Sequence, residues 1–394
     1  MKANLFILIA GILLSGFSYD FNMLLISRII QGITFAALAV CLYILVVTQL
    51  DEDSISIALG LVSSAGYIAV TSAPVISSWT SYLTSWRISF LLVIIFCIID
   101  YILLFNTELD WHEEKELNMT GSLLYALLMV FFTVGLINLD ENWGIVLFGL
   151  SIALTVIFIA HEKNSENKIY NLSLLKDRKY VIGNFAAFTS YFTTFILTYI
   201  VTLYLEINIK ISPQISGLIL LITPVVMIFV SPISGRLSLN YDTRILSATG
   251  FSILLISVVM FYFIDIIPFE ILLAALLIQG IGHGIFSAPN NVFVLTSISE
   301  DDLPDASALL TTSKELGKAV SLAVLTIIAL FIFENDNLGL YEVDLVLITK
   351  RMMIVIIIML TLCIVLLLIS RYYSDDKFNP EMLEKLYSLN PFRR

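Results

Sequence analysis

The chain has 394 residues, of which 59% are hydrophobic and 13% are charged, and its formal net charge is −11. Soluble domains carry about 25% charged residues, so a soluble fold of this size, a disordered chain and a disulfide-stapled scaffold are excluded. The negative charge also argues against nucleic acid as a partner. The three cysteines lie singly within apolar runs, as core residues do. The composition predicts an integral membrane protein.

Apolar runs long enough to cross a bilayer recur along the whole chain. A spanning helix needs about 20 apolar residues, whereas a barrel strand needs only about 9–11, so the runs predict an all-α polytopic membrane protein. The first run follows Lys2 and resembles a signal peptide in length, but a second run starts almost at once, which favours a span. The twelve predicted spans lie near residues 4–18, 22–47, 55–79, 86–106, 119–139, 143–160, 179–203, 214–235, 245–264, 268–294, 305–333 and 350–370.

Basic residues are distributed unevenly between alternate loops. If the N-terminus is cytoplasmic, fourteen Lys and Arg residues lie on the inner side and only four on the outer side. Positive charge concentrates in cytoplasmic loops. Both termini are therefore predicted to be cytoplasmic, in a multi-pass protein of the plasma membrane. The four basic residues predicted on the outer side are Arg87, Lys210, Lys350 and Arg351.

The longest predicted cytoplasmic loop divides the chain into two groups of spans. Residues 1–106 are predicted to form a helical bundle of four spans, and residues 107–178 an additional span pair with the loop. Residues 179–370 are predicted to form a six-helix bundle. Residues 371–394 form a cytoplasmic tail, either as an amphipathic helix on the inner leaflet or as a solvated segment.

Four local patterns follow one another in a fixed order along the chain. They are Ser27-Arg28-Ile29-Ile30-Gln31-Gly32; Gly60 through Pro74 with Ser85-Trp86-Arg87; Pro213, Gly217, Pro224 and Gly235-Arg236-Leu237; and Gly280, Gly282, Gly284 and Lys314-Glu315-Leu316-Gly317. Together they resemble the major facilitator superfamily, and specifically its fourteen-span drug:proton antiporter branch. The resemblance implies a two-bundle helical transporter that exports small organic compounds or drugs in exchange for protons.

One feature of the chain departs from that branch. The R-x-x-Q-G motif belongs to the fourth span in the family, whereas Arg28 to Gly32 lie in the second predicted span here. The chain therefore resembles spans three to fourteen, with the first two absent, and we expect either a misplaced start codon or a truncated gene. The spans between residues 119 and 160 correspond to the extra central pair of the family.

Five polar residues within the predicted spans are candidates for a proton and substrate pathway. Charged side chains deep in a bilayer cost about 2.5–3.5 kcal/mol on insertion scales, so each needs a partner or a role. They are Arg28, Gln31, His283, Lys314 and Glu315.

Each of these candidates has a structural alternative. The resemblance implies a proton relay or polar pairing for Arg28, but the side chain could equally tie two helices together or reach the headgroups. Lys314 and Lys318 lie one helical turn apart and could face a watery cavity or extend to the cytoplasmic surface. His283 could switch charge near neutral pH, or remain a neutral, hydrogen-bonded core residue.

Small residues and a loop motif predict helix packing and conformational change. In the third span, close packing is favoured over a hinge because alanine and serine replace several of the glycines usual in the family. Five aromatic residues of the seventh span, from Phe185 to Tyr199, could line a cavity or face lipid or a neighbouring helix. The predicted packing and conformational residues are Gly32, Gly60, Pro74, Gly235, Arg236, Gly280, Gly284 and Gly317.

Catalytic and nucleotide-binding motifs are absent from the sequence. It contains no H-E-x-x-H, G-x-S-x-G or Walker A pattern, so we predict no enzyme, metal, cofactor or nucleotide partner. The partners expected for a secondary transporter are a small-molecule substrate, protons and the lipid bilayer. The alternative function is a truncated, non-transporting remnant or interaction protein. An intramembrane enzyme would need paired acids or a Ser/His set, and the sequence contains neither.

Overall fold

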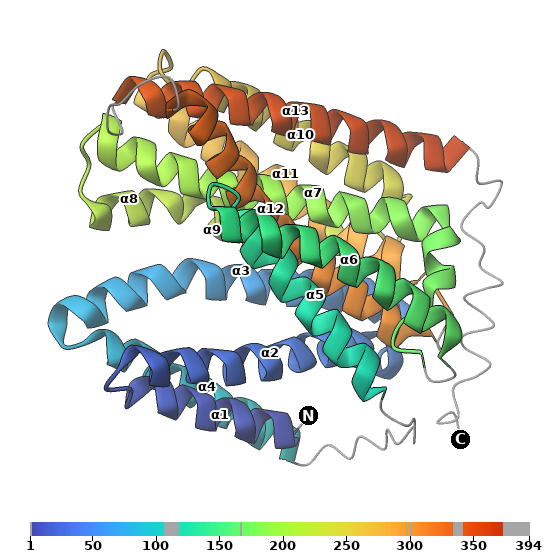
Figure 1. The fold of residues 1–394 in the computed structure, drawn as a ribbon. Helices are drawn as coiled ribbons and strands as arrows, with labels where there is room; N and C mark the ends of the chain where they lie inside the picture. Colours follow the sequence, from blue (N-terminus) through green and yellow to red (C-terminus); the bar gives the residue numbers. More distant parts are fainter. Residues whose placement is uncertain are drawn as a thin grey trace.

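A computed structural model describes most of the chain, and within the described residues the regular structure is entirely helical (Figure 1). The predicted cytoplasmic tail after residue 372 lies outside the described residues, as does most of the segment that joins the first four spans to the central pair. The described ranges are 2–105, 118–165, 168–296, 298–299, 302–333 and 342–372.

Four helices form the N-terminal half: α1 (Lys2–Gly16), α2 (Phe21–Gln49), α3 (Glu52–Leu83) and α4 (Trp86–Phe105). Helix α1 packs against both α2 and α4, and these three helices lie together at the bottom of Figure 1. The Asp20 carboxylate starts α2 by accepting a hydrogen bond from the Met23 amide at 2.7 Å. The Arg87 guanidinium donates two hydrogen bonds to the Ser18 carbonyl, which fixes the start of α4 beside the end of α1.

An antiparallel hairpin follows, made of α5 (Met119–Ile137) and α6 (Asn142–Asn164). The two helices approach closely where Gly135 of α5 lies against the backbone of α6 near Phe148. Beyond its own partner, α5 packs against α12 of the C-terminal half. The hairpin lies in front of the other helices in Figure 1.

The C-terminal half contains the largest hydrophobic core, which lies among α7, α10, α11, α12 and α13. The rings of Phe251 and Phe286 stack in it with centroids 4.2 Å apart, and Phe192 is almost fully buried. The elements are η1 (Leu172–Lys176), α7 (Arg178–Leu203), η2 (Tyr204–Asn208), α8 (Pro213–Leu220), α9 (Ile222–Leu237), α10 (Thr243–Tyr262), α11 (Phe269–Leu295), α12 (Leu303–Phe333) and α13 (Glu342–Tyr372).

The linker between α6 and α7 is anchored to the start of α12. The Asn171 amide donates to the Asp305 carboxylate, and its side-chain amide donates to Asp302, both at 2.8 Å. Burial raises the pKa of Tyr170 to about 12, so its hydroxyl stays protonated and donates to Tyr180 at 3.1 Å. These contacts hold the linker against the C-terminal half.

The fold class predicted from the sequence is confirmed. Each predicted span contains a helix, and ten helices of the described residues are long and apolar enough to cross a membrane. The two shorter apolar stretches are α1 and, within α3, Ser54–Ala69. The predicted span 214–235 is broken at Leu221, between α8 and α9.

The last predicted span begins earlier than the sequence analysis placed it. Helix α13 starts at Glu342 rather than at residue 350, so Lys350 and Arg351 lie inside a helix and not in an outer loop. An ion pair accompanies this extension: the Lys350 ammonium lies 2.8 Å from the Asp265 carboxylate, and both side chains remain partly exposed. The predicted span starts at the charged residues Lys350 and Arg351, so it leaves out the part of the helix that precedes them.

The two halves meet closely along α3 and α9. Gly60 of α3 lies where a β-carbon would be 2.8 Å from the Ser231 carbonyl oxygen, and Gly235 of α9 lies directly against the Ser56 carbonyl. The Ser64 hydroxyl also donates to the Ile228 carbonyl at 3.0 Å. The absence of side chains at both glycines lets the two backbones approach.

A second hydrophobic core extends this contact. It joins Ile44 and Leu59 of the N-terminal half to Leu295, Leu303 and Leu310 of the C-terminal half. These residues lie near the end of α2, the start of α3, the end of α11 and the start of α12, which we call the packed end. The described parts of the two halves are therefore joined by apolar packing at the packed end.

We predict that Gly60→Leu separates α3 from α9 and destabilises the protein. Overpacking a tight contact costs about 1–3 kcal/mol, so the midpoint of thermal unfolding in detergent should fall. Gly32→Leu is the matched control, because no atom lies within 4 Å of the position of its β-carbon. Equal midpoints for Gly60→Leu and Gly32→Leu would contradict the packing described here.

Candidate functional site

Lys314 of α12 is buried where the two halves meet. Its ammonium donates hydrogen bonds to the Tyr43 hydroxyl of α2 at 2.8 Å and to the Asn291 side-chain oxygen of α11 at 2.9 Å. The residue is only 6% exposed. A single cation therefore links three helices, one from the N-terminal half and two from the C-terminal half.

The surroundings of Lys314 are aromatic and neutral. Its ammonium lies 4.8 Å from the centroid of the Tyr43 ring and 5.5 Å from that of Tyr191 in α7. Such cation–π contacts are worth about 0.5–2 kcal/mol, depending on desolvation. Among the described residues no carboxylate lies within ion-pair distance of this ammonium. The positive charge is thus held by dipoles and rings alone.

One helical turn away, Lys318 has a carboxylate partner. Its ammonium lies 2.7 Å from the Glu315 carboxylate, and the two side chains are 31% and 58% exposed. It also lies 5.5 Å from the centroid of the Tyr191 ring. Tyr191 therefore contacts both lysines, and only the charge of Lys318 is compensated by an acid.

His283 of α11 lies on the other side of Tyr191. Its Nδ1 atom is within hydrogen-bond distance of the Ser190 hydroxyl (2.7 Å) and the Thr194 hydroxyl (3.0 Å), both of α7. The rings of Tyr67 and Tyr191 meet its ring edge-on, each with centroids 5.5 Å apart. Since the residue is only 1% exposed, its surroundings match those of a hydrogen-bonded core histidine more closely than those of a freely solvated switch.

These residues form one connected group, which we call the Lys314–His283 cluster. A hydroxyl of α3 completes it, because Ser63 accepts hydrogen bonds from Ser287 at 3.0 Å and from the Asn291 side chain at 3.4 Å. Its members are Tyr43, Ser63, Tyr67, Tyr191, His283, Ser287, Asn291, Lys314, Glu315 and Lys318.

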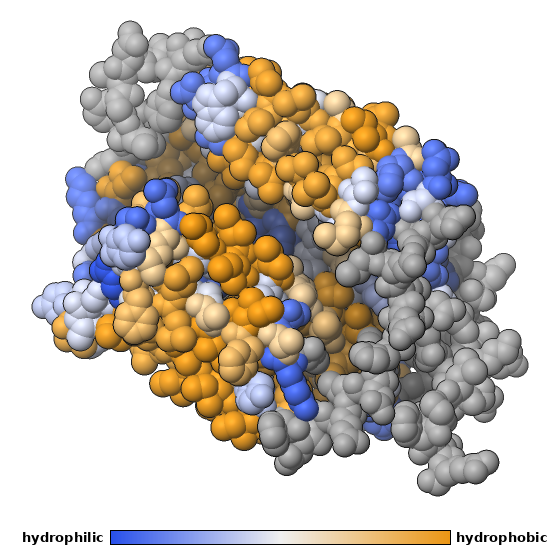
Figure 2. Space-filling model, turned by 60° about the horizontal axis from the view of Figure 1, so that its bottom comes forward, coloured by the Kyte–Doolittle hydropathy of each residue, from blue (hydrophilic) through white to orange (hydrophobic). Residues whose placement is uncertain are grey.

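The cluster extends from the middle of its helices towards the packed end. His283 and Glu315 lie near mid-helix, whereas Tyr43 and Asn291 lie six and four residues before the ends of α2 and α11. His283 stands 14 residues after the start of α11 and 12 before its end, or roughly 20 Å from each at 1.5 Å per residue. Secondary transporters bind substrates near the bilayer midplane, at the interface between their repeats. The depth of His283 and the interface position of the cluster match this arrangement. Figure 2 shows a hollow between two apolar surfaces, with hydrophilic side chains in its depth.

Arg28 and Gln31 are not part of the cluster. The Gln31 amide donates to the Gly11 carbonyl at 3.0 Å and to the Ser15 hydroxyl at 2.6 Å, both in α1. The Arg28 guanidinium donates to the Gln31 side-chain oxygen at 3.1 Å and lies 4.4 Å from the centroid of the Phe90 ring in α4. These contacts favour the interpretation that the pair ties α2 to α1 and α4.

Three of the predicted packing glycines lie at helix–helix contacts of the C-terminal half. Gly280 and Gly284 of α11 face α9, where Thr223 and Val230 lie against them. Gly317 of α12 lies directly against the Phe188 carbonyl of α7. Any larger residue at these positions would displace backbone or branched side chains.

The other three predicted residues have different surroundings. Gly32 of α2 has open space on its face. Arg236 is exposed in the last turn of α9. Pro74 lies within α3, but its side chain is outside the described residues.

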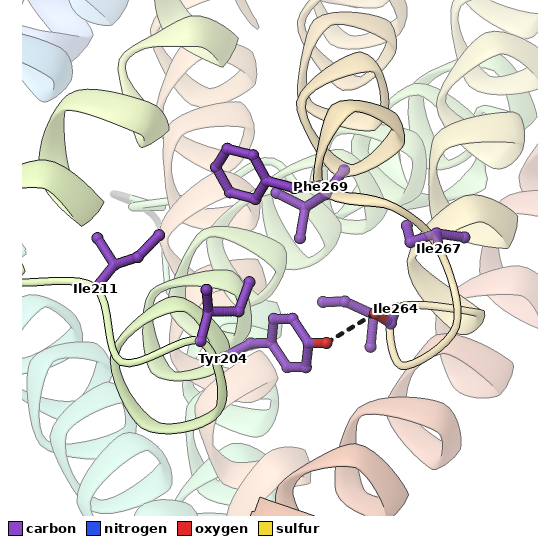
Figure 3. Close-up of a pocket in the computed structure, with 7 residues that line it drawn as sticks. Tyr204, Ile211, Ile264, Ile267 and Phe269 are labelled. Atoms are coloured by element: carbon purple, nitrogen blue, oxygen red, sulfur yellow. Dashed lines mark hydrogen bonds between the residues drawn. The ribbon is translucent and has the colours of Figure 1, made fainter.

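An apolar pocket of about 250 Å³ lies apart from the cluster (Figure 3). It opens where η2 meets the turn between α10 and α11, and the Tyr204 hydroxyl closes one side by donating to the Ile264 carbonyl at 2.9 Å. The lining contains no charged side chain, so the pocket offers shape but no group for coupling or ion recognition. Its lining residues are Tyr204, Ile209, Ile211, Ile264, Ile267, Phe269 and Leu272.

The sequence analysis missed several members of the cluster. Tyr43, Tyr191 and Asn291 were not predicted, although Asn290 and Asn291 form an amide pair inside an apolar helix. Buried amides in a spanning helix need partners, so this pair was a detectable signal. The tyrosines carried no signal of their own, because their role depends on which residues of other helices lie beside them.

The profile of the Major Facilitator Superfamily matches residues 3–161 and 183–393. The chain belongs to the Major Facilitator Superfamily. It is therefore a membrane transporter by family, with multiple spans in the cell membrane.

Relatives support the predicted resemblance to the drug:proton branch. The lincomycin resistance protein LmrB of Listeria monocytogenes is 24% identical, over 80% of this chain and 69% of its own length. The multidrug export protein EmrB of Escherichia coli is 23% identical, over 79% of this chain and 63% of its own length. The riboflavin transporter RibZ of Clostridioides difficile is 27% identical, over 81% of this chain and 70% of its own length. The chain thus spans between 63% and 70% of the length of these relatives.

Solved structures show the same fold. The human organic anion transporter MFSD10 superposes with a TM-score of 0.63 at 14% identity, over 93% of this chain and 76% of that one. A structure described as showing substrate recognition in proton-dependent oligopeptide transporters gives a TM-score of 0.52 at 11% identity, over 98% of this chain and 84% of that one. At these identities the likeness concerns the fold alone.

We predict that the Glu315 side of the cluster is accessible to water. The Glu315 carboxylate is 58% exposed at mid-depth and needs a polar surrounding. Glu315→Cys should therefore react with a membrane-impermeant, charged thiol reagent after replacement of the three native cysteines. Ala323→Cys, fully buried two turns further along α12, is the control and should stay unreacted. Equal protection of both positions would show that Glu315 does not face an aqueous cavity.

Proposed function

We propose that this protein is a secondary active transporter that exports small organic compounds or drugs in exchange for protons by alternating access. The observation that carries the proposal is the Lys314–His283 cluster. It places ionisable groups at mid-depth and draws them from both halves. A movement of one half against the other would change their hydrogen bonds and their access to water, which is the requirement for coupling a proton to a substrate.

Direction and substrate type are supported by the relatives. Two of them are described as a lincomycin resistance protein and a multidrug export protein, and another is described as a riboflavin transporter. All three descriptions concern small organic compounds. Export is thus the direction we propose for this chain.

The packed end supplies the moving contact. At Gly60 and Gly235 the backbones of α3 and α9 touch directly, and the second hydrophobic core lies beside them, so opening this end would expose apolar surface that a movement elsewhere must compensate. With the N-terminus on the cytoplasmic side, as the basic residues predict, the packed end is the cytoplasmic end. The proposed moving bodies are residues 1–106 and 179–370, with the α5–α6 hairpin between them.

Proton coupling is assigned to the titratable groups of the cluster. The Glu315 carboxylate of α12 can release Lys318 when it is protonated. His283 of α11 is the second candidate, and its hydrogen bonds to Ser190 and Thr194 would have to rearrange before it could take up a proton. The charged and titratable groups that face them are Lys314, Tyr67 of α3 and Tyr191 of α7. One proton crossing 100 mV supplies about 2.3 kcal/mol, enough for roughly a fiftyfold substrate gradient.

We predict that proton-driven efflux depends on the cluster. Purified protein in liposomes loaded with ethidium, riboflavin or fluorescein should export at least one of these dyes when an inward proton gradient is imposed. Lys314→Met and His283→Leu should each lower the initial rate at least about tenfold, because each removes an ionisable group from the interface. Lys350→Met is the matched control, because Lys350 of α13 pairs with Asp265 and neither residue belongs to the cluster.

Three results would decide against the proposal. Efflux that persists after the proton gradient is collapsed would exclude proton coupling. Efflux unchanged by both cluster variants would place the coupling elsewhere. A folded protein that moves none of the dyes would favour the alternative, a non-transporting membrane protein that retains the fold.

A further inference from the structure

On the basis of the transport function proposed above, we propose that Lys314 is the binding group for an organic anion, so that the substrates of this protein carry a carboxylate or a similar acidic group. The proposed subsite lies between α2, α7, α11 and α12 and is bounded by Tyr43, Tyr191 and Asn291. The charge balance, the free hydrogen-bond donors and the aromatic surroundings of Lys314 support this assignment.

The charge balance singles out Lys314 among the lysines of the spans. Lys318 has the Glu315 carboxylate at 2.7 Å, and Lys350 has the Asp265 carboxylate at 2.8 Å. Lys314 is the more deeply buried residue, yet its described partners are a hydroxyl, an amide oxygen and two rings. A buried charge is normally paired. An acidic group of a substrate would supply the partner that the described residues do not.

Hydrogen-bond donors remain for that partner. A lysine ammonium has three N–H donors, and two of them are used by Tyr43 and Asn291. The Tyr43 oxygen accepts from Lys314, so its own hydroxyl hydrogen points elsewhere and can donate. The third N–H of Lys314 and the O–H of Tyr43 together provide two donors side by side. Two adjacent donors match the two oxygens of a carboxylate.

The rings around the ammonium indicate the rest of the molecule. Tyr43 and Tyr191 flank Lys314, and Tyr67 lies across His283 from Tyr191. Aromatic side chains favour stacked or edge-on contacts with other rings. An aromatic acid would place its acidic group on Lys314 and its ring among these tyrosines. Its arrival would also compensate the buried charge at the contact between the two halves.

The experiment compares acids with their uncharged amides on the purified full chain in detergent. The probes are 1-naphthoate, 4-phenylbenzoate and indole-3-acetate, each against its primary amide, with affinity measured by titration calorimetry. Each pair has nearly the same shape and differs mainly in charge. Wild-type protein should bind at least one acid about tenfold or more tightly than its amide.

Variants assign that preference to Lys314. Lys314→Met should abolish the preference for the acid, whereas Lys314→Arg, which keeps the charge, should retain most of it. Lys350→Met should behave as the wild type, because Lys350 already has a carboxylate partner in Asp265 and lies outside the proposed subsite. If Lys314→Met does not fold, as judged by its thermal unfolding, the acid–amide comparison in wild-type and Lys314→Arg protein still tests the charge dependence.

Two outcomes overturn the proposal. In one, wild-type protein binds each acid no more tightly than its amide; in the other, Lys314→Met keeps the preference, and Lys314 is then a structural link between α2, α11 and α12. The dye assay separates this failure from that of the transport function. If the protein exports ethidium or riboflavin but shows no preference for acids, the transport proposal stands and the anion site is rejected. If it binds acids but exports none of the dyes, the anion site stands and the transport proposal is rejected.

Discussion

A single buried ammonium group at the contact between the two halves organises the centre of this protein. Lys314 carries a positive charge into the interface and holds Tyr43 of one half and Asn291 of the other at hydrogen-bond distance. Isolated buried charges are costly, so the surrounding residues are constrained to supply dipoles and rings. The placement of Tyr191 between both lysines and His283 follows from the same constraint. An anion bound at this charge, or a change in the charge of a neighbouring group, acts on both halves at once.

The packing around the cluster allows that change to become a movement. Gly60 and Gly235 bring α3 and α9 into backbone contact, and the second hydrophobic core adds apolar contacts at the packed end. The C-terminal half has a much larger core of its own, with aromatic stacking between Phe251 and Phe286. The strongest packing therefore lies within that half, and the contact between the halves is thinner. Such a difference favours motion along the interface over deformation of the core.

The sequence was sufficient for the fold class, because spanning helices are determined by the length of apolar runs, which is a local property. Tertiary contacts were not predicted: α13 extends beyond the apolar run to Glu342, and within this extension Lys350 pairs with Asp265, a residue distant in the sequence. For the site, the sequence identified His283, Lys314 and Glu315 as separate candidates but did not indicate that Tyr191 joins them. It also grouped Arg28 with them, since a charge inside a span looks the same whether it ties neighbouring helices or lines a pathway.

The central claim is that the charge at Lys314 controls the contact between the two halves, and a distance measurement tests it most directly. Spin labels at Asp51→Cys and Asn240→Cys, two exposed turns at the packed end, would report the separation of the halves by pulsed electron paramagnetic resonance in liposomes. We predict a second, longer distance that gains population when an aromatic acid is added, and that no longer responds to the acid in Lys314→Met. A distance distribution that is the same under all conditions, or that responds equally in Lys314→Met, would contradict the account.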